Sequence, residues 1–261
     1  MAAPVLIDTL NFKVTLVEAF SRGQAPQPSR SHSATGFFYK QNDDKYLVTN
    51  RHVVVSENDQ RYPDFLRIKV HTSRTSLVPT RSIEIPLYDG ARSLWIEHPD
   101  NPNIQDPKEK IDLAVVKINN NIQDADVMEF FVAADLPRDD LLLGVGDLCI
   151  ITGYPYAFHD SLHYLPVVRS GTIASTLGAH FRGRKCFLVD SKLHPGTSGS
   201  PVVVPFSSVR RDKAGGVGIG AFPPVLIGVN SGTYQGLDLN TVWYSSLIPE
   251  TINQPQPATH H

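Results

Sequence analysis

The sequence has few cysteines and no long apolar run. Its 261 residues include only two cysteines, Cys149 and Cys186. No segment approaches the roughly eighteen consecutive apolar residues that a membrane-spanning helix needs. The formal net charge is −2, and lysine and arginine are scattered along the chain, so neither a nucleic-acid footprint nor a membrane-surface patch is indicated. We therefore predict a protein with no nucleic-acid partner and no membrane partner.

The two cysteines also indicate the compartment. Each lies inside an apolar, strand-like run, and two buried free thiols are typical of a reducing environment. The first residues contain no basic start followed by a long apolar region, so a secretory signal is not expected. We expect a cytoplasmic protein, and a single disulfide in an exported protein is the alternative.

Long segments with a helical period are absent as well. Short apolar runs separated by Gly, Pro, Asn and Asp predict an all-β chain of many short strands. A stretch rich in Asn and Asp at about 119–140 reads as a connection between two units. The strands are expected at about 11–19, 34–40, 46–50, 65–72, 82–87, 93–97 and 112–118, and then at 147–152, 165–176, 185–190, 201–205, 225–231 and 241–247.

The segment Pro195–Pro201, PGTSGSP, is a candidate nucleophile turn between two apolar runs. A hydroxyl that attacks a carbonyl must be exposed, must have a base beside it and must have N–H groups aimed at the developing oxyanion. Glycines at 196 and 199 allow a tight turn that aims the N–H groups of Gly196 and Ser198 at one point. An ordinary β-turn is the alternative, because Gly, Ser and Pro dominate such turns.

A candidate base and a candidate acid precede this turn. His52 follows the β-rich run 46–50, and a neutral imidazole at a strand end can accept a proton from a hydroxyl. Asp112 opens the apolar run 113–118, and half-buried acids are rare unless they have a partner. The order His52, Asp112, Ser198, each in an apolar β context, predicts a Ser-His-Asp triad.

Six segments together resemble the chymotrypsin-like or trypsin-like serine peptidases, and most closely the bacterial HtrA-type branch. They are 34–39, 47–54, 112–118, 152–155, 170–173 and 195–201. The resemblance implies a serine endopeptidase in which His52 is the general base, Asp112 orients it and Ser198 is the nucleophile. It also implies an oxyanion hole of Gly196 and Ser198. Ser200 departs from the second glycine of many relatives, and no PDZ-like segment follows.

The resemblance further implies two packed six-stranded antiparallel β-barrels with the active site in the cleft between them. We place the first barrel at 1–125, the second at 126–250 and a flexible tail at 251–261. The expected partner is a polypeptide substrate that pairs with the strand edge at Asn230, Ser231 and Gly232. No cofactor is implied. A catalytically silent or gated peptide-binding module on the same fold remains an alternative, as does a viral or phage-type processing protease.

The primary pocket and three minor motifs complete the predictions. The resemblance places Lys192, Leu193 and His194 at the pocket wall, which disfavours basic substrate residues and favours an apolar pocket dominated by Leu193. An acid-accepting pocket is the alternative. His159 and His163 have a metal-ligand spacing, but no third ligand is evident, so no metal is expected. The glycine-rich run 215–220 and the small basic clusters are interpreted as surface loops.

Overall fold

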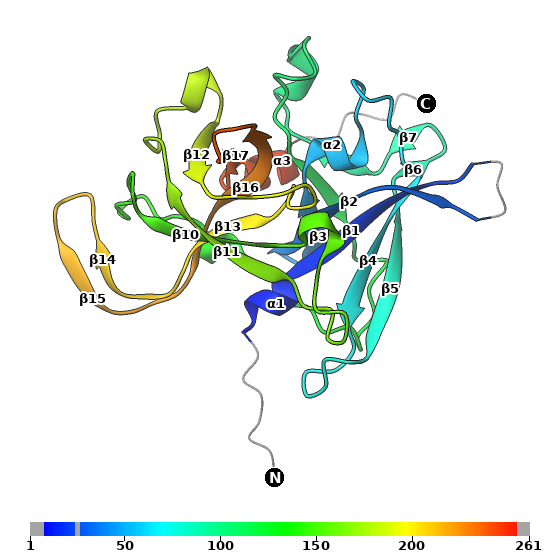
Figure 1. Ribbon diagram of the computed structural model, residues 1–261, viewed down its shortest axis with the longest axis horizontal. Helices are drawn as coiled ribbons and strands as arrows, with labels where there is room; N and C mark the ends of the chain where they lie inside the picture. The colour runs from blue at the N-terminus through cyan, green and yellow to red at the C-terminus, as the bar shows by residue number, and fades with distance from the viewer. Residues whose placement is uncertain (1–7, 24–26, 255–261) are drawn as a thin grey trace.

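A computed structural model describes residues 8–23 and 27–254 of the chain. The fold is almost entirely β-structure, with three short α-helices and four short 3-10 helices in these ranges. Figure 1 shows the strands of the first half gathered on the right and those of the second half on the left. No helix of the described residues is long and apolar enough to cross a membrane.

The first half forms an antiparallel sheet of seven strands in the order β5-β4-β1-β2-β3-β9-β8. Alternating burial shapes its strands, as in β5, where Ile83 and Ile85 are buried and Glu84 between them is exposed. The strands are β1 Val14–Ser21, β2 Ser29–Gln41, β3 Asp44–Thr49, β4 Phe65–His71, β5 Thr80–Pro86, β8 Trp95–Glu97 and β9 Ala114–Lys117. In the described residues this sheet is not closed into the six-stranded barrel that we expected.

The second half contains a closed six-stranded barrel in the order β10-β11-β12-β17-β16-β13. Its inward side chains include Cys149, Ile151, Phe187 and Val202, which share one hydrophobic cluster. The strands are β10 Leu148–Gly153, β11 Val167–Ile173, β12 Cys186–Asp190, β13 Pro201–Val204, β16 Val225–Tyr234 and β17 Leu239–Tyr244.

Short elements join or extend these two groups. One is a hairpin of β14 and β15, which projects from the barrel in Figure 1. These elements are α1 Leu10–Lys13, α2 Arg51–Val54, α3 Leu247–Ile252, β6 Tyr88–Asp89, β7 Arg92–Ser93, β14 Ser207–Arg211, β15 Val217–Phe222, η1 Asn101–Asn103, η2 Ala133–Asp135, η3 Pro155–Ala157 and η4 Phe181–Gly183. The prediction of a surface loop at 215–220 was wrong, because this run enters β15.

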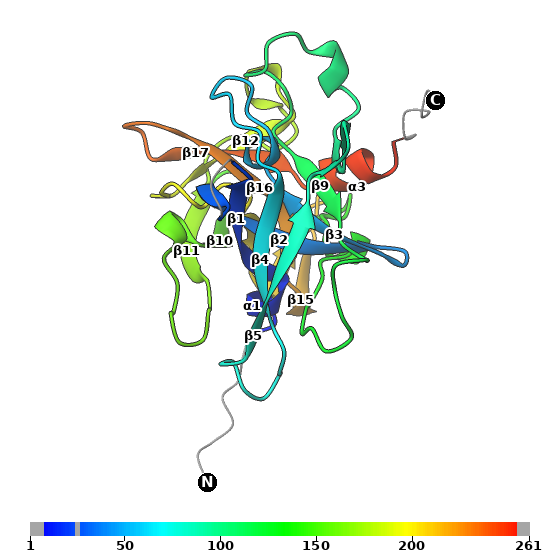
Figure 2. The ribbon, with the colours of Figure 1, turned by 90° about the vertical axis from the view of Figure 1, so that its right-hand side faces the viewer.

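The boundaries between the units also differ from the prediction. The chain leaves the first sheet only after Phe131, whose N–H donates to the carbonyl of Phe38. At the other end, helix α3 packs against β8 and β9 of the first half, as Figure 2 shows for β9. Thr251 is fully buried there, so the expected tail cannot begin at 251. Residues 255–261 of that tail lie outside the described residues.

A shared hydrophobic cluster packs the two halves together. It contains Phe37 and Val115 from the first sheet and Leu226 and Trp243 from the barrel, all at most 1% exposed. Burial of large side chains contributes about 1.5–3 kcal/mol each. The cluster therefore fixes how the polar residues at the junction face one another.

Candidate active site

His52 lies in the single helical turn α2, directly after β3. The side-chain amide of Asn50 donates to the carbonyl of Asp112 at 2.7 Å. This bond joins the entry of α2 to the chain that leads into β9. The imidazole is thereby held opposite the carboxylate of Asp112.

Asp112 accepts three hydrogen bonds at its carboxylate. The His52 N–H donates to Oδ1 at 2.8 Å, and His52 Nδ1 lies 2.7 Å from Oδ2. The hydroxyl of Ser231 donates to Oδ2 at 2.6 Å. Burial alone would raise the pKa of Asp112, but the charge of His52 and these hydrogen bonds lower it to about 2. Asp112 is therefore a carboxylate at neutral pH.

The same pair sets the protonation of His52. Burial would lower the pKa of His52, but the charge of Asp112 and the hydrogen bond to it outweigh burial and raise this pKa above 6.5. With Nδ1 bound to the carboxylate, Nε2 is the nitrogen that can accept a proton.

Ser198 lies on a turn between β12 and β13 that only glycine can complete. Gly196 has a φ of +96° and Gly199 a φ of +82°, in the region that L side chains rarely adopt. A Cβ on Gly196 would also lie 2.5 Å from the carbonyl oxygen of Tyr154, and one on Gly199 would clash with the carbonyl oxygen of Thr35. The turn therefore requires both glycines.

The N–H groups of Gly196 and Ser198 have no hydrogen-bond partner among residues 8–23 and 27–254. Neighbouring groups hold the turn instead. Pro195 accepts a hydrogen bond at its carbonyl from the N–H of Tyr156 at 2.6 Å. Tyr156 itself has a φ of +53°, so the chain accepts a strained residue there. The peptide plane that carries the Gly196 N–H is thus fixed while that N–H stays free.

Thr35 of the first half supports the same turn. Its hydroxyl donates to the carbonyl of Gly196 at 2.8 Å and accepts from the N–H of Tyr154 at 3.0 Å. Its own N–H donates to the carbonyl of Ser198 at 2.8 Å. Thr35 is fully buried. Sequence reasoning did not assign it a role, although it lies in one of the six motifs.

Ser198 is partly exposed, and its hydroxyl donates a long hydrogen bond of 3.4 Å to the carbonyl of Ser231. In the described part of the chain no hydrogen bond joins Ser198 to His52. Ser231 also binds Asp112, so it contacts two of the three predicted triad residues. Catalytic hydrogen bonds are often long before a substrate binds.

Two predicted substrate contacts require correction. Asn230 is 1% exposed, and its amide donates to the carbonyl of Thr197 at 2.9 Å. It therefore holds the nucleophile turn and is shielded from a substrate. Leu193 is 6% exposed and belongs to the hydrophobic cluster of the barrel, so it packs the core. Neither the position of Leu193 just before the nucleophile turn nor that of Asn230 at a strand edge could distinguish these inward side chains from outward ones.

The other predicted contacts lie nearer the surface. His194 is partly exposed and stacks on Tyr156, with ring centroids 5.5 Å apart. Lys192 is exposed. Gly232 lines the cavity that opens beside His52. The two other histidines find local partners: His163 pairs with Asp160 at 2.7 Å, and His159 packs against Tyr164. Among the residues that the structure describes, no group of three His, Cys, Asp or Glu side chains is placed so that it could hold a metal ion.

Arg51, the residue before His52, anchors α2 through acids other than Asp112. Its guanidinium binds Glu57 in a bidentate pair and Glu97 through Nε at 2.5 Å. The side chain of Arg51 is only 8% exposed, and bidentate pairs of this kind are geometrically specific. The hydrogen bond from Arg51 contributes most to lowering the pKa of Glu57, to about 2. Sequence analysis did not identify this cluster. Glu57 lies six positions from Arg51 and Glu97 lies 46 positions away, and only the fold brings both acids to one guanidinium.

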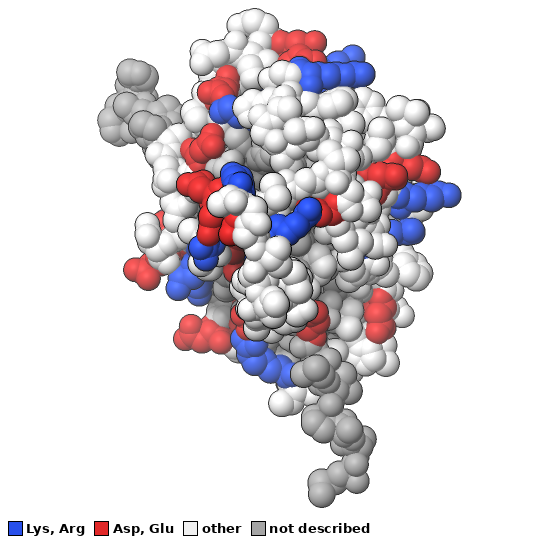
Figure 3. Space-filling view, turned by 90° about the vertical axis from the view of Figure 1, so that its left-hand side faces the viewer, with Lys and Arg blue, Asp and Glu red and all other residues white. Residues whose placement is uncertain are grey.

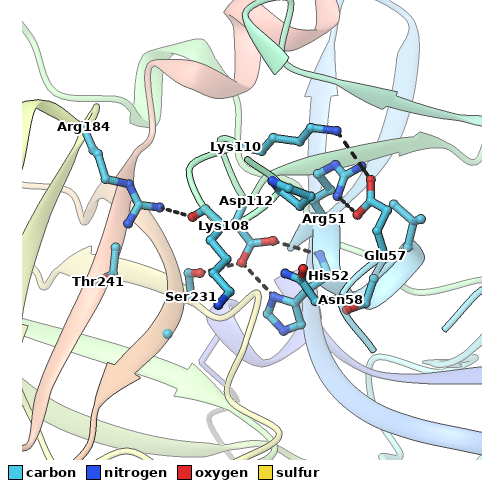
Figure 4. A pocket seen from close by; sticks show the side chains of 14 residues that line it. Arg51, His52, Glu57, Asn58, Lys108, Lys110, Asp112, Arg184, Ser231 and Thr241 are labelled. Atoms are coloured by element: carbon cyan, nitrogen blue, oxygen red, sulfur yellow. Dashed lines mark hydrogen bonds and ion pairs between the residues drawn. The ribbon is translucent and has the colours of Figure 1, made fainter. Parts of the chain in front are cut away.

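A cavity of about 230 Å³ opens beside these residues (Figure 4). His52, Asp112 and Ser231 form one wall of this cavity, and Lys108 and Arg184 reach into it from the other side. The site therefore combines a polarised imidazole, a glycine-flanked hydroxyl, two free N–H groups and an adjoining cavity.

Antiparallel strands that bring a serine, a histidine and an aspartate to one junction are typical of one class of Ser-His-Asp proteins. A family model described as the trypsin-like peptidase domain matches residues 34–205. The chain belongs to this family, and the match covers Thr35, His52, Asp112 and Ser198. No curated protein matches the chain.

Proposed function

We propose that the protein is a serine endopeptidase. The observation that carries the proposal is the Asp112 carboxylate, 2.7 Å from His52 Nδ1, at the junction where the glycine-flanked Ser198 also lies. The free N–H groups of Gly196 and Ser198 support it, because an oxyanion hole needs donors without internal partners. Membership of the trypsin-like peptidase family supports a polypeptide as the substrate.

In the proposed reaction Ser198 Oγ attacks the carbonyl carbon of the scissile peptide bond, and its proton passes to His52 Nε2. Asp112 holds the resulting imidazolium, while Gly196 and Ser198 donate N–H groups to the oxyanion. The tetrahedral intermediate then collapses, and His52 gives the proton to the leaving amine. Water attacks the acyl-enzyme by the same steps and releases the free acid.

The proposal includes the architecture and the branch of the family. We propose that the seven-stranded sheet is the counterpart of the first of two barrels, with the site between it and the closed barrel. Hydrogen bonds from Thr35 to the nucleophile turn support this arrangement. The HtrA-type branch is proposed on the sequence motifs alone, and no cofactor is required by the steps above.

A serine-directed fluorophosphonate tests the proposal. We expect covalent labelling at Ser198 in the unmodified chain and none in Ser198→Ala. Hydrolysis of a casein or peptide pool should fall by about 10⁴-fold or more in Ser198→Ala and in His52→Ala, and the two losses should not add in the double variant. Circular dichroism should show that both variants remain folded.

The test also addresses the silent or gated module. The hydrogen bond from Ser198 to Ser231 rather than to His52 is the observation that favours such a gated state. A folded chain that neither reacts with the probe nor cleaves the pool would reject the peptidase. Labelling without cleavage would instead indicate a gated enzyme.

A further inference from the structure

The cavity beside His52 adjoins a free strand edge. Strand β16 pairs with β13 only as far as Val229, and in the described part of the chain no strand covers this edge from Ser231 onward. Ser231 and Gly232 then line the cavity. A peptide that adds to such an edge gains main-chain hydrogen bonds and places alternate side chains in adjacent pockets. A polypeptide bound at Ser198 would therefore pass this cavity.

Cations dominate the outer side of this cavity. Figure 4 shows the side chain of Lys108 running from its loop toward His52 and Ser231. Its ammonium group has no carboxylate within ion-pair distance in the described ranges, although the carbonyl of Lys108 accepts from Arg184 at 3.4 Å. Arg184 is stacked on Trp243, with its guanidinium carbon 4.9 Å from the ring centroid. The carboxylate that pairs with Arg184 is that of Glu109, 3.7 Å from Arg184 Nε, and the side chain of Glu109 is exposed.

The acids that line the cavity are already engaged. Glu57 binds Arg51 and lies 3.4 Å from the ammonium of Lys110. Asp112 accepts from His52 and Ser231. Neither carboxylate forms an ion pair with Lys108 in the described residues. An arriving anion would thus find Lys108 unneutralised and Arg184 only loosely paired.

We propose that this cavity is a subsite for an acidic side chain, Asp or Glu, of the polypeptide substrate. The proposal rests on the proposed peptidase function and adds a substrate class to it. A carboxylate in the cavity would pair with the ammonium of Lys108 or with the guanidinium of Arg184, whose planar fork suits carboxylate oxygens. A basic side chain would meet two cations and no free acid, which disfavours it.

The preference should be modest, because Lys108 is exposed. Ion pairs at exposed sites contribute about 0.2–1 kcal/mol. This free energy corresponds to about a 1.5- to 5-fold change in affinity. The partial enclosure of the cavity and the second cation, Arg184, should raise this factor. We expect peptides with Glu in the cavity to have a kcat/KM about 3- to 10-fold higher than those with Gln, and salt should reduce the ratio.

The experiment uses binding and cleavage in parallel. A proteome-derived peptide pool is first bound to the full chain carrying Ser198→Ala, and the retained peptides are identified by mass spectrometry. The same pool is offered to the chain carrying both Ser198→Ala and Lys108→Glu. Acidic peptides should be enriched on the first chain about 3-fold or more, and the charge reversal should abolish this enrichment. The matched control is Lys213→Glu, since Lys213 is also exposed and does not line this cavity.

The cleavage arm locates the subsite. The active chain and its Lys108→Glu variant digest the same pool, and the position of acidic residues relative to the cut is read from the products. Equal retention of acidic and neutral peptides by the Ser198→Ala chain would overturn the subsite, whether or not the active chain cleaves. Absence of both cleavage and fluorophosphonate labelling would overturn the peptidase, while charge-selective retention would still support the subsite.

Discussion

Replacement of Thr35 by valine tests how the two halves assemble the site. Valine keeps the volume of threonine but lacks its hydroxyl. The carbonyl of Gly196 and the N–H of Tyr154, now 2.8 Å and 3.0 Å from that hydroxyl, would lose this partner at a fully buried position. Each buried polar group without a partner costs about 1–3 kcal/mol. We therefore expect the free energy of unfolding to fall by about 2 kcal/mol or more.

The effect on reactivity should be similar in size to the effect on folding. Loss of an oxyanion donor typically costs about 10²–10³ in rate, and Thr35→Val misaligns such a donor without removing it. We expect the second-order rate of fluorophosphonate labelling at Ser198 to fall about 10- to 100-fold. The rate is measured below the unfolding midpoint, which urea titration followed by tryptophan fluorescence gives for each variant.

Two controls make the result interpretable. Thr35→Ser keeps the hydroxyl and should stay within about 3-fold of the original labelling rate. Thr15→Val removes another buried hydroxyl, which donates to the carbonyl of Lys69 at 2.9 Å, and should lower stability but not the rate. If folded Thr35→Val reacts as fast as the unmodified chain, the hydrogen bonds of Thr35 do not align the turn and our reasoning is refuted.

Two further predictions concern titration and thiols. His52 must be neutral to accept a proton, and its pKa is raised above 6.5, so labelling at Ser198 should be lost as the pH falls through a midpoint above 6.5. A rate profile that is flat from pH 5 to 9 would contradict this role. Cys149 and Cys186 are free and at most 1% exposed, and burial raises the pKa of Cys149 to about 12. A thiol reagent should therefore react slowly with the native chain and with two thiols after denaturation without reductant, whereas a count of zero would indicate a disulfide.

The sequence by itself determined the strands and the local geometry of the nucleophile turn. Each of the thirteen expected strands overlaps a strand of the structure, because alternating burial and turn residues act over a few positions. The glycines of PGTSGSP could be identified as necessary for the same reason, since a left-handed φ is a local requirement. The glycine-rich run at 215–220 was misread, because glycines carry no side chain that could display the strand period.

Only the tertiary structure decided which residues support the site and which line its cavity. The hydrogen bond from Thr35 to Gly196 spans 161 positions, and the pair of Arg51 with Glu97 spans 46. Asn230 and Leu193 are near the site in sequence but point inward. Lys108 and Arg184 come from separate loops and meet beside His52 only when the shared apolar cluster has packed the two halves. Contacts of this kind depend on the whole fold, so no local pattern in the sequence could reveal them.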